Sequence, residues 1–257
     1  MTELDLKTKW LGKPLLLFDE VHSTNQYCKE HLQQLAHGSV VMADCQRQGR
    51  GSRDRKWAQK PGQSLAISML LSVEHAEVLQ TLTLVTALAA AYTLESFDLY
   101  PCIKWPNDLL LGGRKITGIL CEGSFMDRRA MVVCGIGINL LQSREWFDSM
   151  NLPYAGSVFS QTGKRLSLER VVEDFLVKFE ECFDRWQSEG FSTAFLGDYE
   201  KRCITCGREV MIETKQGRIC GVAKKITTGG ELLCQIGNQE KVFFQNEASV
   251  RGLMGYF

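Results

Sequence analysis

The spacing of glycine and apolar residues changes near residue 203 and divides the chain into two parts. After Gly207, short apolar runs alternate with glycines, a pattern that predicts a small β barrel of about five or six strands. Those glycines are Gly217, Gly221, Gly229, Gly230 and Gly237. A chain of 257 residues has room for one large domain and a small second one. We therefore expect a domain over residues 1–203 and a β-barrel domain over residues 204–257.

Strands and helices both occur before residue 203. Apolar residues recur at helical spacing over 168–188, and Ala and Leu dominate 79–97, so both segments are predicted to be long helices. Shorter helices are predicted over 26–35 and 192–201, and a loop over 142–165. Strands are predicted over 15–18, 39–43, 64–71, 102–105, 109–111, 115–121 and 131–138. This order predicts an α+β fold, with a mixed, mostly antiparallel sheet and helices packed on one side.

Charge and cysteine usage exclude several classes of protein. The chain carries 30 basic and 30 acidic residues, so its net charge gives no long-range attraction to nucleic acid or to an anionic membrane. No apolar run approaches the length of a membrane span, and the first residues lack the pattern of a signal peptide. The ten cysteines do not form the pattern of a disulfide framework, which favours free thiols in a reducing, cytoplasmic compartment.

A loop for a small anion is predicted at residues 49–57. It contains Gly49, Arg50, Gly51, Arg53, Arg55, Lys56 and Trp57. Glycines leave the backbone N–H groups free to form an anion-binding concavity, and an arginine fork binds phosphate or carboxylate at two points. Because the chain as a whole is neutral, this local excess of positive charge is specific to the loop.

Three further polar clusters lie at predicted strand ends and turns, at residues 23–25, 104–108 and 114–120. Ser23, Thr24 and Asn25 are also explained as a helix cap. Pro106 with the following Asn and Asp is also a common turn. Taken singly, each cluster is a weak indication of function.

Together, in this order, the clusters resemble the biotin–protein ligase family, the biotin–[acetyl-CoA-carboxylase] ligases. The resemblance rests on the motifs at 23–25, 46–57, 104–108, 114–120 and 135–139, and it covers roughly residues 15–140. It implies a sheet of the class II synthetase and biotin-ligase type, followed by an SH3-like barrel. It also implies that biotin and ATP react to biotinyl-5′-AMP and pyrophosphate, and that the biotinyl group then passes to one lysine of an acceptor domain.

The resemblance also implies roles for individual residues. A carboxylate that attacks a phosphate requires fixed positive charge, and the catalytic candidates are Lys115 and Arg50. The biotin-binding candidates are Ser23, Thr24, Asn25, Gln46, Gly49, Arg50, Lys115 and Gly118. The ATP-binding candidates are Arg50, Arg53, Arg55, Lys56, Trp57, Asn107, Asp108, Asn139 and Arg251.

Magnesium is expected to arrive with ATP rather than in a protein cage, with Asn107 or Asp108 helping to position it, so no metal-ligand set is assigned. The tryptophans at 57 and 105 either line the pocket or belong to the core. The expected partner is a biotin carboxyl carrier protein, the biotinyl domain of a biotin-dependent carboxylase. A homodimer is possible, and neither nucleic acid nor a membrane is expected.

Two departures from the family pattern bear on function. Ser52 stands where many members have an arginine that helps to cover the adenylate, so either Arg53 compensates or the intermediate leaks. Only about 14 residues precede the first predicted strand, too few for a helix-turn-helix domain, so we expect no repressor role.

Other functions remain open at this stage. A lipoate or octanoate ligase or transferase shares the general fold, and an octanoyltransferase would need Cys121 as its nucleophile. A DNA-binding regulator would use the 49–57 loop on phosphates, but the neutral charge argues against it. A zinc site at Cys203 and Cys206 lacks a second ligand pair nearby in the sequence.

Overall fold

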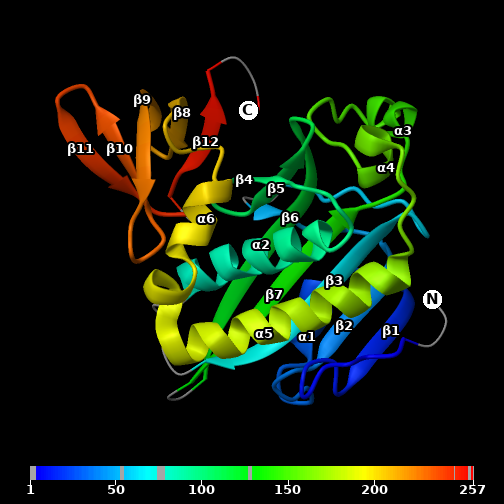
Figure 1. The fold of residues 1–257 in the computed structure, drawn as a ribbon. Coiled ribbons are helices and arrows are strands. Elements are labelled where there is room, and N and C mark those ends of the chain that lie inside the picture. Colours follow the sequence, from blue (N-terminus) through cyan, green and yellow to red (C-terminus); the bar gives the residue numbers. More distant parts are fainter. Residues whose placement is uncertain are drawn as a thin grey trace.

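The computed structural model describes residues 4–52, 55–73, 79–126, 129–245, 247–253 and 256. The first part contains β1 (Leu15–Val21), α1 (Thr24–Glu30), β2 (Val40–Gln46), β3 (Ser64–Val73), α2 (Leu79–Glu95), β4 (Cys102–Lys104), β5 (Asp108–Leu111), β6 (Arg114–Met126), β7 (Arg129–Asn139), α3 (Arg144–Ser149), α4 (Val158–Thr162), α5 (Leu168–Ala194) and α6 (Leu196–Arg202). The second part contains β8 (Glu209–Thr214), β9 (Gly217–Ile226), β10 (Leu232–Ile236), β11 (Gln239–Phe243) and β12 (Ser249–Gly252) (Figure 1).

The larger sheet has seven strands in the order β1-β2-β3-β7-β6-β5-β4. The pair β1 and β2 is parallel, because α1 connects them as a crossover, and the other neighbours are antiparallel. The predicted mixed, mostly antiparallel sheet is confirmed. Its central strands β3 and β7 pair over ten positions, from Ser64 with Asn139 to Val73 with Ala130.

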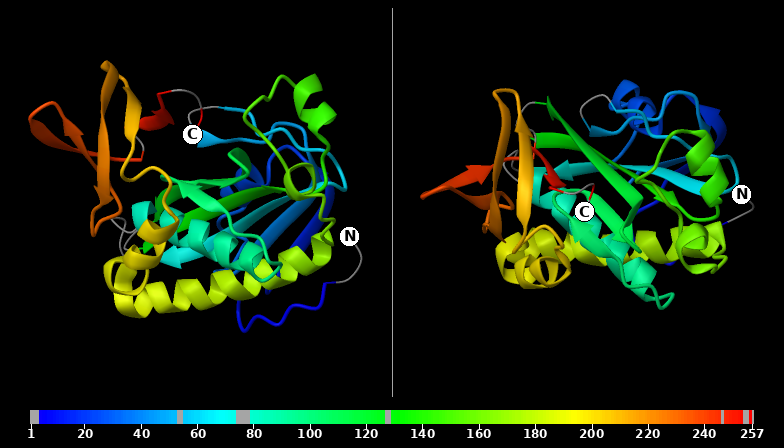
Figure 2. Two further views of the ribbon diagram at one scale, coloured as in Figure 1. Left: turned by 45° about the horizontal axis from the view of Figure 1, so that its top comes forward. Right: turned by 90° about the horizontal axis from the view of Figure 1, so that it is seen from above.

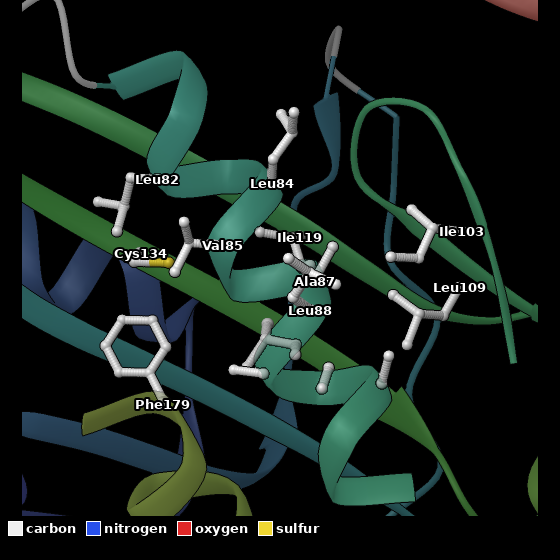
Figure 3. Packing of buried hydrophobic residues seen from close by; sticks show 14 of the residues in the cluster. Leu82, Leu84, Val85, Ala87, Leu88, Ile103, Leu109, Ile119, Cys134 and Phe179 are labelled. Atoms are coloured by element: carbon white, nitrogen blue, oxygen red, sulfur yellow. The ribbon is translucent and has the colours of Figure 1, made fainter. Parts of the chain in front are cut away.

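The long helices α2 and α5 cover one face of this sheet (Figures 1 and 2). Helix α2 is apolar on all sides because it lies between the sheet and α5, whereas α5 is amphipathic and buries one stripe. Figure 3 shows Val85 of α2 beside Cys134 of β7, with Phe179 of α5 near both, and all three belong to one core cluster. The short helix α1 packs on the opposite face, where Cys28 meets Val41 and Leu70. That face, in front of the start of α1, carries the site described below.

The second sheet has five antiparallel strands in the order β11-β10-β9-β8-β12 (Figure 2). It joins the first part through several contacts. The Trp105 indole N–H donates to the carbonyl of Gly230 at 3.0 Å, and the N–H of Ile226 donates to Glu200 Oε1 at 3.1 Å. Residues 204–257 remain our proposed second domain.

Local differences from the predicted elements have physical causes. The predicted loop over 142–165 is wrong in part, since it contains α3 and α4. The hydroxyls of Ser143 and Ser157 cap these helices, and Ser157 forms a capping box with Ser160. Helix α5 extends past the predicted end to Ala194, with a break in helical geometry at Gly190 (φ 77°). In the described part of the chain, no helix is long and apolar enough to cross a membrane.

Candidate active site

A pocket opens on the α1 face of the larger sheet. It is formed by the start of α1, the end of β2 with the loop that follows, and the middle of β3, β6 and β7. The lining residues are Ser23, Thr24, Asn25, Gln46, Arg50, Gly51, Ser52, Trp57, Ala66, Ile67, Asn107, Lys115, Gly118, Ile119, Leu120, Gly135, Ile136 and Gly137. Segments that are far apart in the sequence therefore meet around one cavity.

Two glycines of β7 form part of the floor of the pocket. Strand alternation directs Cys134 and Ile138 into the core beneath α2, and leaves Gly135 and Gly137 on the pocket side. A Cβ atom on Gly137 would lie 2.5 Å from Cζ2 and 2.7 Å from Nε1 of the Trp57 ring. A Cβ atom on Gly135 would lie 2.7 Å from Cγ of Asn25. The absence of side chains at both positions allows Trp57 and Asn25 to lie directly on the sheet.

A hydrogen-bond network fixes the polar groups at one end of the pocket. Gln46 Oε1 accepts from the backbone N–H of Thr24 at 2.9 Å and from its hydroxyl at 3.2 Å. Asn25 is held at both ends of its amide, since Ser68 Oγ donates to Oδ1 at 2.6 Å and Nδ2 donates to Leu120 O at 3.1 Å. Ser23 caps α1 by accepting from the N–H of Gln26. These hydrogen bonds orient the side chains before any ligand binds.

A cluster of charges lies at the other end, around the buried carboxylate of Asp108. Lys115 Nζ lies 2.5 Å from Oδ1 of Asp108, and Lys104 Nζ lies 3.5 Å from Oδ2. Burial opposes ionisation of Asp108, but the two ammonium groups outweigh it and lower its pKa to about 2. Burial lowers the pKa of Lys104 to about 8, against the attraction of Asp108. Two cations share one anion here, so the cluster keeps a net positive charge when both lysines are protonated.

A tyrosine from the end of the chain completes this cluster. The Tyr256 hydroxyl donates to Oδ2 of Asp108, and Lys104 Nζ lies 4.5 Å from the centre of the Tyr256 ring. The same ring stacks on Tyr154 with centroids 5.6 Å apart. Burial and the charge of Asp108 raise the pKa of Tyr256, so its hydroxyl stays protonated as a donor. The second part of the chain thus contributes a side chain beside Lys115.

The arginine-rich loop folds back on itself beside the pocket. The N–H of Trp57 donates to Gly49 O at 2.9 Å, and that of Gly51 donates to Arg55 O at 2.7 Å. Arg55 also reaches Ser249 Oγ of β12 at 3.5 Å, so the loop contacts the second sheet. The Arg50 guanidinium is exposed, with Nη1 3.4 Å from Gln26 Oε1. Its charge is available to an anion at the mouth of the pocket.

Comparison with known proteins agrees with this geometry. Residues 17–139 match the family described as the Biotin/lipoate A/B protein ligase family. The bifunctional ligase/repressor BirA of Bacillus spizizenii is 31% identical over 234 residues, which are 90% of this chain and 72% of that protein. The chain belongs to this ligase family. The biotin–[acetyl-CoA-carboxylase] ligase of Mycobacterium tuberculosis is 29% identical over 80% of this chain and 76% of that protein.

Among solved structures of this family, a biotin protein ligase from Aquifex aeolicus in complex with biotin and ATP is similar over most of this chain. The TM-score is 0.81 at 30% identity, and the match covers 93% of this chain and 99% of that chain. The predicted ligase-type fold, a mixed sheet with packed helices followed by a small antiparallel sheet, is therefore confirmed.

Most of the residues predicted from the ligase motifs meet in the pocket. The predicted residues that line it are Ser23, Thr24, Asn25, Gln46, Arg50, Trp57, Asn107, Lys115 and Gly118. Gly49 borders it, since a Cβ there would lie 3.2 Å from Gln46 Nε2. Trp57 forms a wall, whereas Trp105 is fully buried in the core. Arg53 lies outside the described residues.

The remaining predicted ATP-binding residues lie outside the pocket lining. Asp108 contacts the pocket through its ion pair with Lys115. Lys56 pairs with Arg50 in an isolated β-bridge of the loop. Asn139 is buried, and its Oδ1 accepts from Gln142 at 2.8 Å. Arg251 lies on β12, with Nε 3.8 Å from Glu213 Oε2. These positions do not test whether the residues bind ATP, so their role in ATP binding stays a prediction.

The residues present do not fit a magnesium site in the protein itself. Asp108 is already engaged by two ammonium groups and a phenol. Asn107 donates its amide to Ile119 O at 2.6 Å. Over the described ranges, no three His, Cys, Asp or Glu side chains come together as metal ligands. The expectation that Asp108 helps to position the ion therefore has no support in this geometry, and we derive no step through magnesium.

Sequence reasoning missed several residues of the site. Ser68 on β3 holds Asn25, and Ala66 and Ile67 line the pocket, but a buried strand gives no sign of this. Tyr256 had no signal in the sequence, because its role depends on how the second part folds back. Cys121 points into the core, with its Sγ 3.2 Å from that of Cys134 beneath α2, away from the pocket. That position argues against Cys121 as an acyl-transfer nucleophile.

Proposed function

We propose that this protein is an ATP-dependent biotin–protein ligase that forms biotinyl-5′-AMP and transfers the biotinyl group to a lysine ε-amine of an acceptor domain. One observation carries the proposal: the hydroxyl and amide groups of Thr24 and Gln46 and the ammonium group of Lys115 line the same pocket. A small organic acid bound there places its apolar part on the glycine floor and its carboxylate near Lys115. Relatives whose solved structure holds biotin and ATP support the choice of acid.

The polar end of the pocket suits the ureido ring of biotin. That ring has two N–H donors and one carbonyl acceptor, and Ser23, Thr24 and Gln46 offer hydroxyl and amide groups that can pair with them. The buried Nε1–H of Trp57 has no hydrogen-bond partner among the described residues. An unpaired buried donor costs about 1–3 kcal/mol, so a ligand acceptor in the pocket gains by satisfying it.

The charged end of the pocket suits adenylation. The biotin carboxylate attacks the α-phosphate of ATP and pyrophosphate leaves, so two anions must approach each other. Lys115 bridges the two groups and stabilises the charge that develops, and Arg50 holds the same junction from the loop. Asp108 positions Lys115 without neutralising the cluster, because Lys104 supplies a second positive charge. No enzyme nucleophile is needed, which agrees with the core position of Cys121.

Further assignments rest on the family pattern and on proximity. We assign Arg53, Arg55 and Lys56 to the departing pyrophosphate and Arg251 and Asn139 to the nucleotide. Magnesium is supplied with ATP, where it neutralises phosphate charge. The acceptor is proposed to be the biotin carboxyl carrier protein of a biotin-dependent carboxylase, in the cytoplasm. The ten free cysteines support a reducing compartment, and pairing at the edge strand β1 is a route to a homodimer.

The decisive experiment is acid-dependent exchange of pyrophosphate into ATP by the purified protein, with biotin, lipoate and octanoate as separate substrates. We expect exchange with biotin, and its loss in Lys115→Met, which keeps the aliphatic stem but removes the charge. Exchange with lipoate or octanoate instead of biotin would overturn the biotin assignment. Lack of exchange with all three acids, in protein shown to be folded by circular dichroism, would overturn the adenylation mechanism.

A further inference from the structure

Two cysteines at the junction between the two parts of the chain lie within reach of each other. Cys203 ends helix α6, and Cys206 follows three residues later. Their Sγ atoms are 3.7 Å apart, and the thiol of Cys206 donates to the sulfur of Cys203. Both thiols are free. Two cysteines separated by two residues form the spacing of redox-active dithiols in reducing compartments.

The turn between these cysteines stabilises a thiolate on Cys203. The Cys206 thiol, the backbone N–H groups of Cys206 and Thr205, and the Thr205 hydroxyl all point at the sulfur of Cys203 and lower its pKa, against the effect of burial. The same coupling and burial raise the pKa of Cys206. The pair is therefore asymmetric, with a nucleophilic sulfur and a protonated partner beside it, as thiol oxidation requires.

The same turn contacts the strand that carries Lys104. Thr205 is fully buried, and its Oγ1 accepts from the backbone N–H of Trp105 at 3.0 Å. The N–H of Ile204 donates to the carbonyl of Ile103 at 2.9 Å. Residues 203–205 thus run beside β4 and fix the backbone on both sides of Lys104. These two hydrogen bonds connect the turn to the strand that carries Lys104 to the charged end of the pocket.

We propose that Cys203 and Cys206 form a redox-active dithiol that a hydroperoxide converts to a disulfide, and that the disulfide lowers adenylation activity by displacing β4. The thiolate of Cys203 attacks one oxygen of the hydroperoxide, the O–O bond breaks, and the leaving oxygen takes up a proton. The sulfur of Cys206 then attacks the sulfenic acid on Cys203, the S–O bond breaks, and water leaves with the Cys206 proton. The two thiols lose two electrons, and hydrogen peroxide is reduced to two waters.

The size of the change follows from the geometry. A disulfide requires an S–S distance of about 2.05 Å, so the two sulfurs must approach by about 1.6 Å from their 3.7 Å separation. The hydroxyl of Thr205 loses its thiolate acceptor in the same step. Because Thr205 stands between the two cysteines, its bond to the Trp105 N–H changes with the turn.

A second close cysteine pair, Cys121 and Cys134, serves as an internal comparison. Their sulfurs are 3.2 Å apart across β6 and β7, but they face the core beneath α2. Cys206 is partly exposed, as Cys121 is, but Cys203 and Cys206 lie on one turn, whereas Cys121 and Cys134 are held apart by the pairing of β6 with β7. Among the residues described here, no third ligand joins Cys203 and Cys206, which favours a dithiol over the zinc site considered from the sequence.

The experiment exposes the full-length reduced protein to graded hydrogen peroxide, blocks remaining thiols with an alkylating agent, and maps peptides by mass spectrometry. We expect a Cys203–Cys206 disulfide at lower peroxide than oxidation of Cys121 or Cys134, and its reversal by dithiothreitol. Cys206→Ser should give no disulfide, and Cys121→Ser should leave the junction disulfide unchanged. Full alkylation of Cys203 and Cys206 at peroxide levels that oxidise other cysteines would overturn the dithiol.

The expected effect of the disulfide on activity rests on the proposed adenylation function, and it is measured separately from the disulfide itself. Biotin-dependent pyrophosphate exchange should fall by about tenfold in the oxidised protein, since a displacement near 1 Å can cost up to about 100-fold, and dithiothreitol should restore it. Peroxide-treated Cys206→Ser should keep its exchange rate. A disulfide seen by mass spectrometry with unchanged exchange would refute the link to β4. In a protein with no exchange activity at all, the peptide map still tests the dithiol.

Discussion

Replacement of Gly137 by alanine tests whether the floor of the pocket determines ligand affinity. The added Cβ would lie 2.5 Å from Cζ2 of Trp57, whereas ordinary contact begins near 3.4 Å. The ring must therefore move by about 0.9 Å or more. Its backbone cannot follow easily, because the N–H of Trp57 is bonded to Gly49 O at 2.9 Å. The ring has to tilt into the cavity or pull the arginine-rich loop away from it.

The expected magnitude follows from the cost of overpacking. Adding a methyl group to a filled site costs about 1–3 kcal/mol. If the bound state bears this cost, the KM for biotin rises by about 5- to 140-fold, since each 1.4 kcal/mol is a factor of ten. The KM for ATP should change less, because the three atoms nearest to the added Cβ all belong to the Trp57 ring and none to Lys115 or Asp108. Gly197→Ala is the matched control, since its Cβ would meet no atom within 4 Å in α6.

The assay is biotin-dependent pyrophosphate exchange at varied biotin and at varied ATP, with melting temperatures of both variants. A Gly137→Ala protein with the wild-type KM for biotin would refute the assignment of this surface as the biotin site. Equal losses for biotin and ATP, together with a large fall in melting temperature, would show general damage instead. Gly197→Ala should match the wild type in both substrates.

Three further predictions concern the charges around the pocket. Asp108→Asn leaves Lys104 buried without its carboxylate, so the free energy of unfolding, measured by urea titration, should fall by about 3–5 kcal/mol. Pyrophosphate exchange should be lost in the same variant. A variant as stable as the wild type would contradict this prediction. Because the pKa of Lys104 is about 8 when folded and 10.5 when unfolded, exchange should decline as pH rises through about 8, when Lys104 no longer shares Asp108 with Lys115. Between about pH 8 and pH 10.5 the unfolded chain binds more protons than the folded chain, so the free energy of unfolding should rise with pH in this range. Lys104→Met should remove both the decline in exchange and the rise in stability. Ser52→Arg should slow release of biotinyl-5′-AMP, followed by rapid filtration, and an unchanged rate would exclude Ser52 as the cause of a leak.

Apolar periodicity was sufficient to predict most elements of this fold. The ranges predicted for α2 and for the strands of the larger sheet differ from the observed ones mainly at the ends. The order of the strands was not accessible, because pairing of β3 with β7 depends on contacts about 70 residues apart along the chain. The helices α3 and α4 were missed because they are stabilised by serine caps rather than by an apolar stripe.

The site was predictable where short motifs carry the chemistry. The loop at 49–57 was predicted from its own glycines and charges, whereas Lys115 and Gln46 were predicted from the resemblance to the motifs of the biotin–protein ligase family. Tyr256 was not found, since a single tyrosine near the end of a chain carries no local pattern. For Asp108 the motif predicted a role toward ATP, which stays a prediction, but not its ion pairs with two lysines. Those pairs depend on distances, which a sequence does not contain.

The arrangement around Asp108 resolves a conflict between holding Lys115 in place and keeping its charge useful. A carboxylate paired with one lysine would fix the ammonium group but cancel its field at the point where two anions must meet. With Lys104 as a second cation, the cluster keeps a net positive charge while Lys115 remains fixed. Tyr256 supplies a neutral hydrogen bond to the same carboxylate, so Asp108 depends less on Lys115 when substrate competes for it. Through Tyr256, the second part of the chain therefore stabilises the carboxylate of Asp108 without adding charge to the pocket.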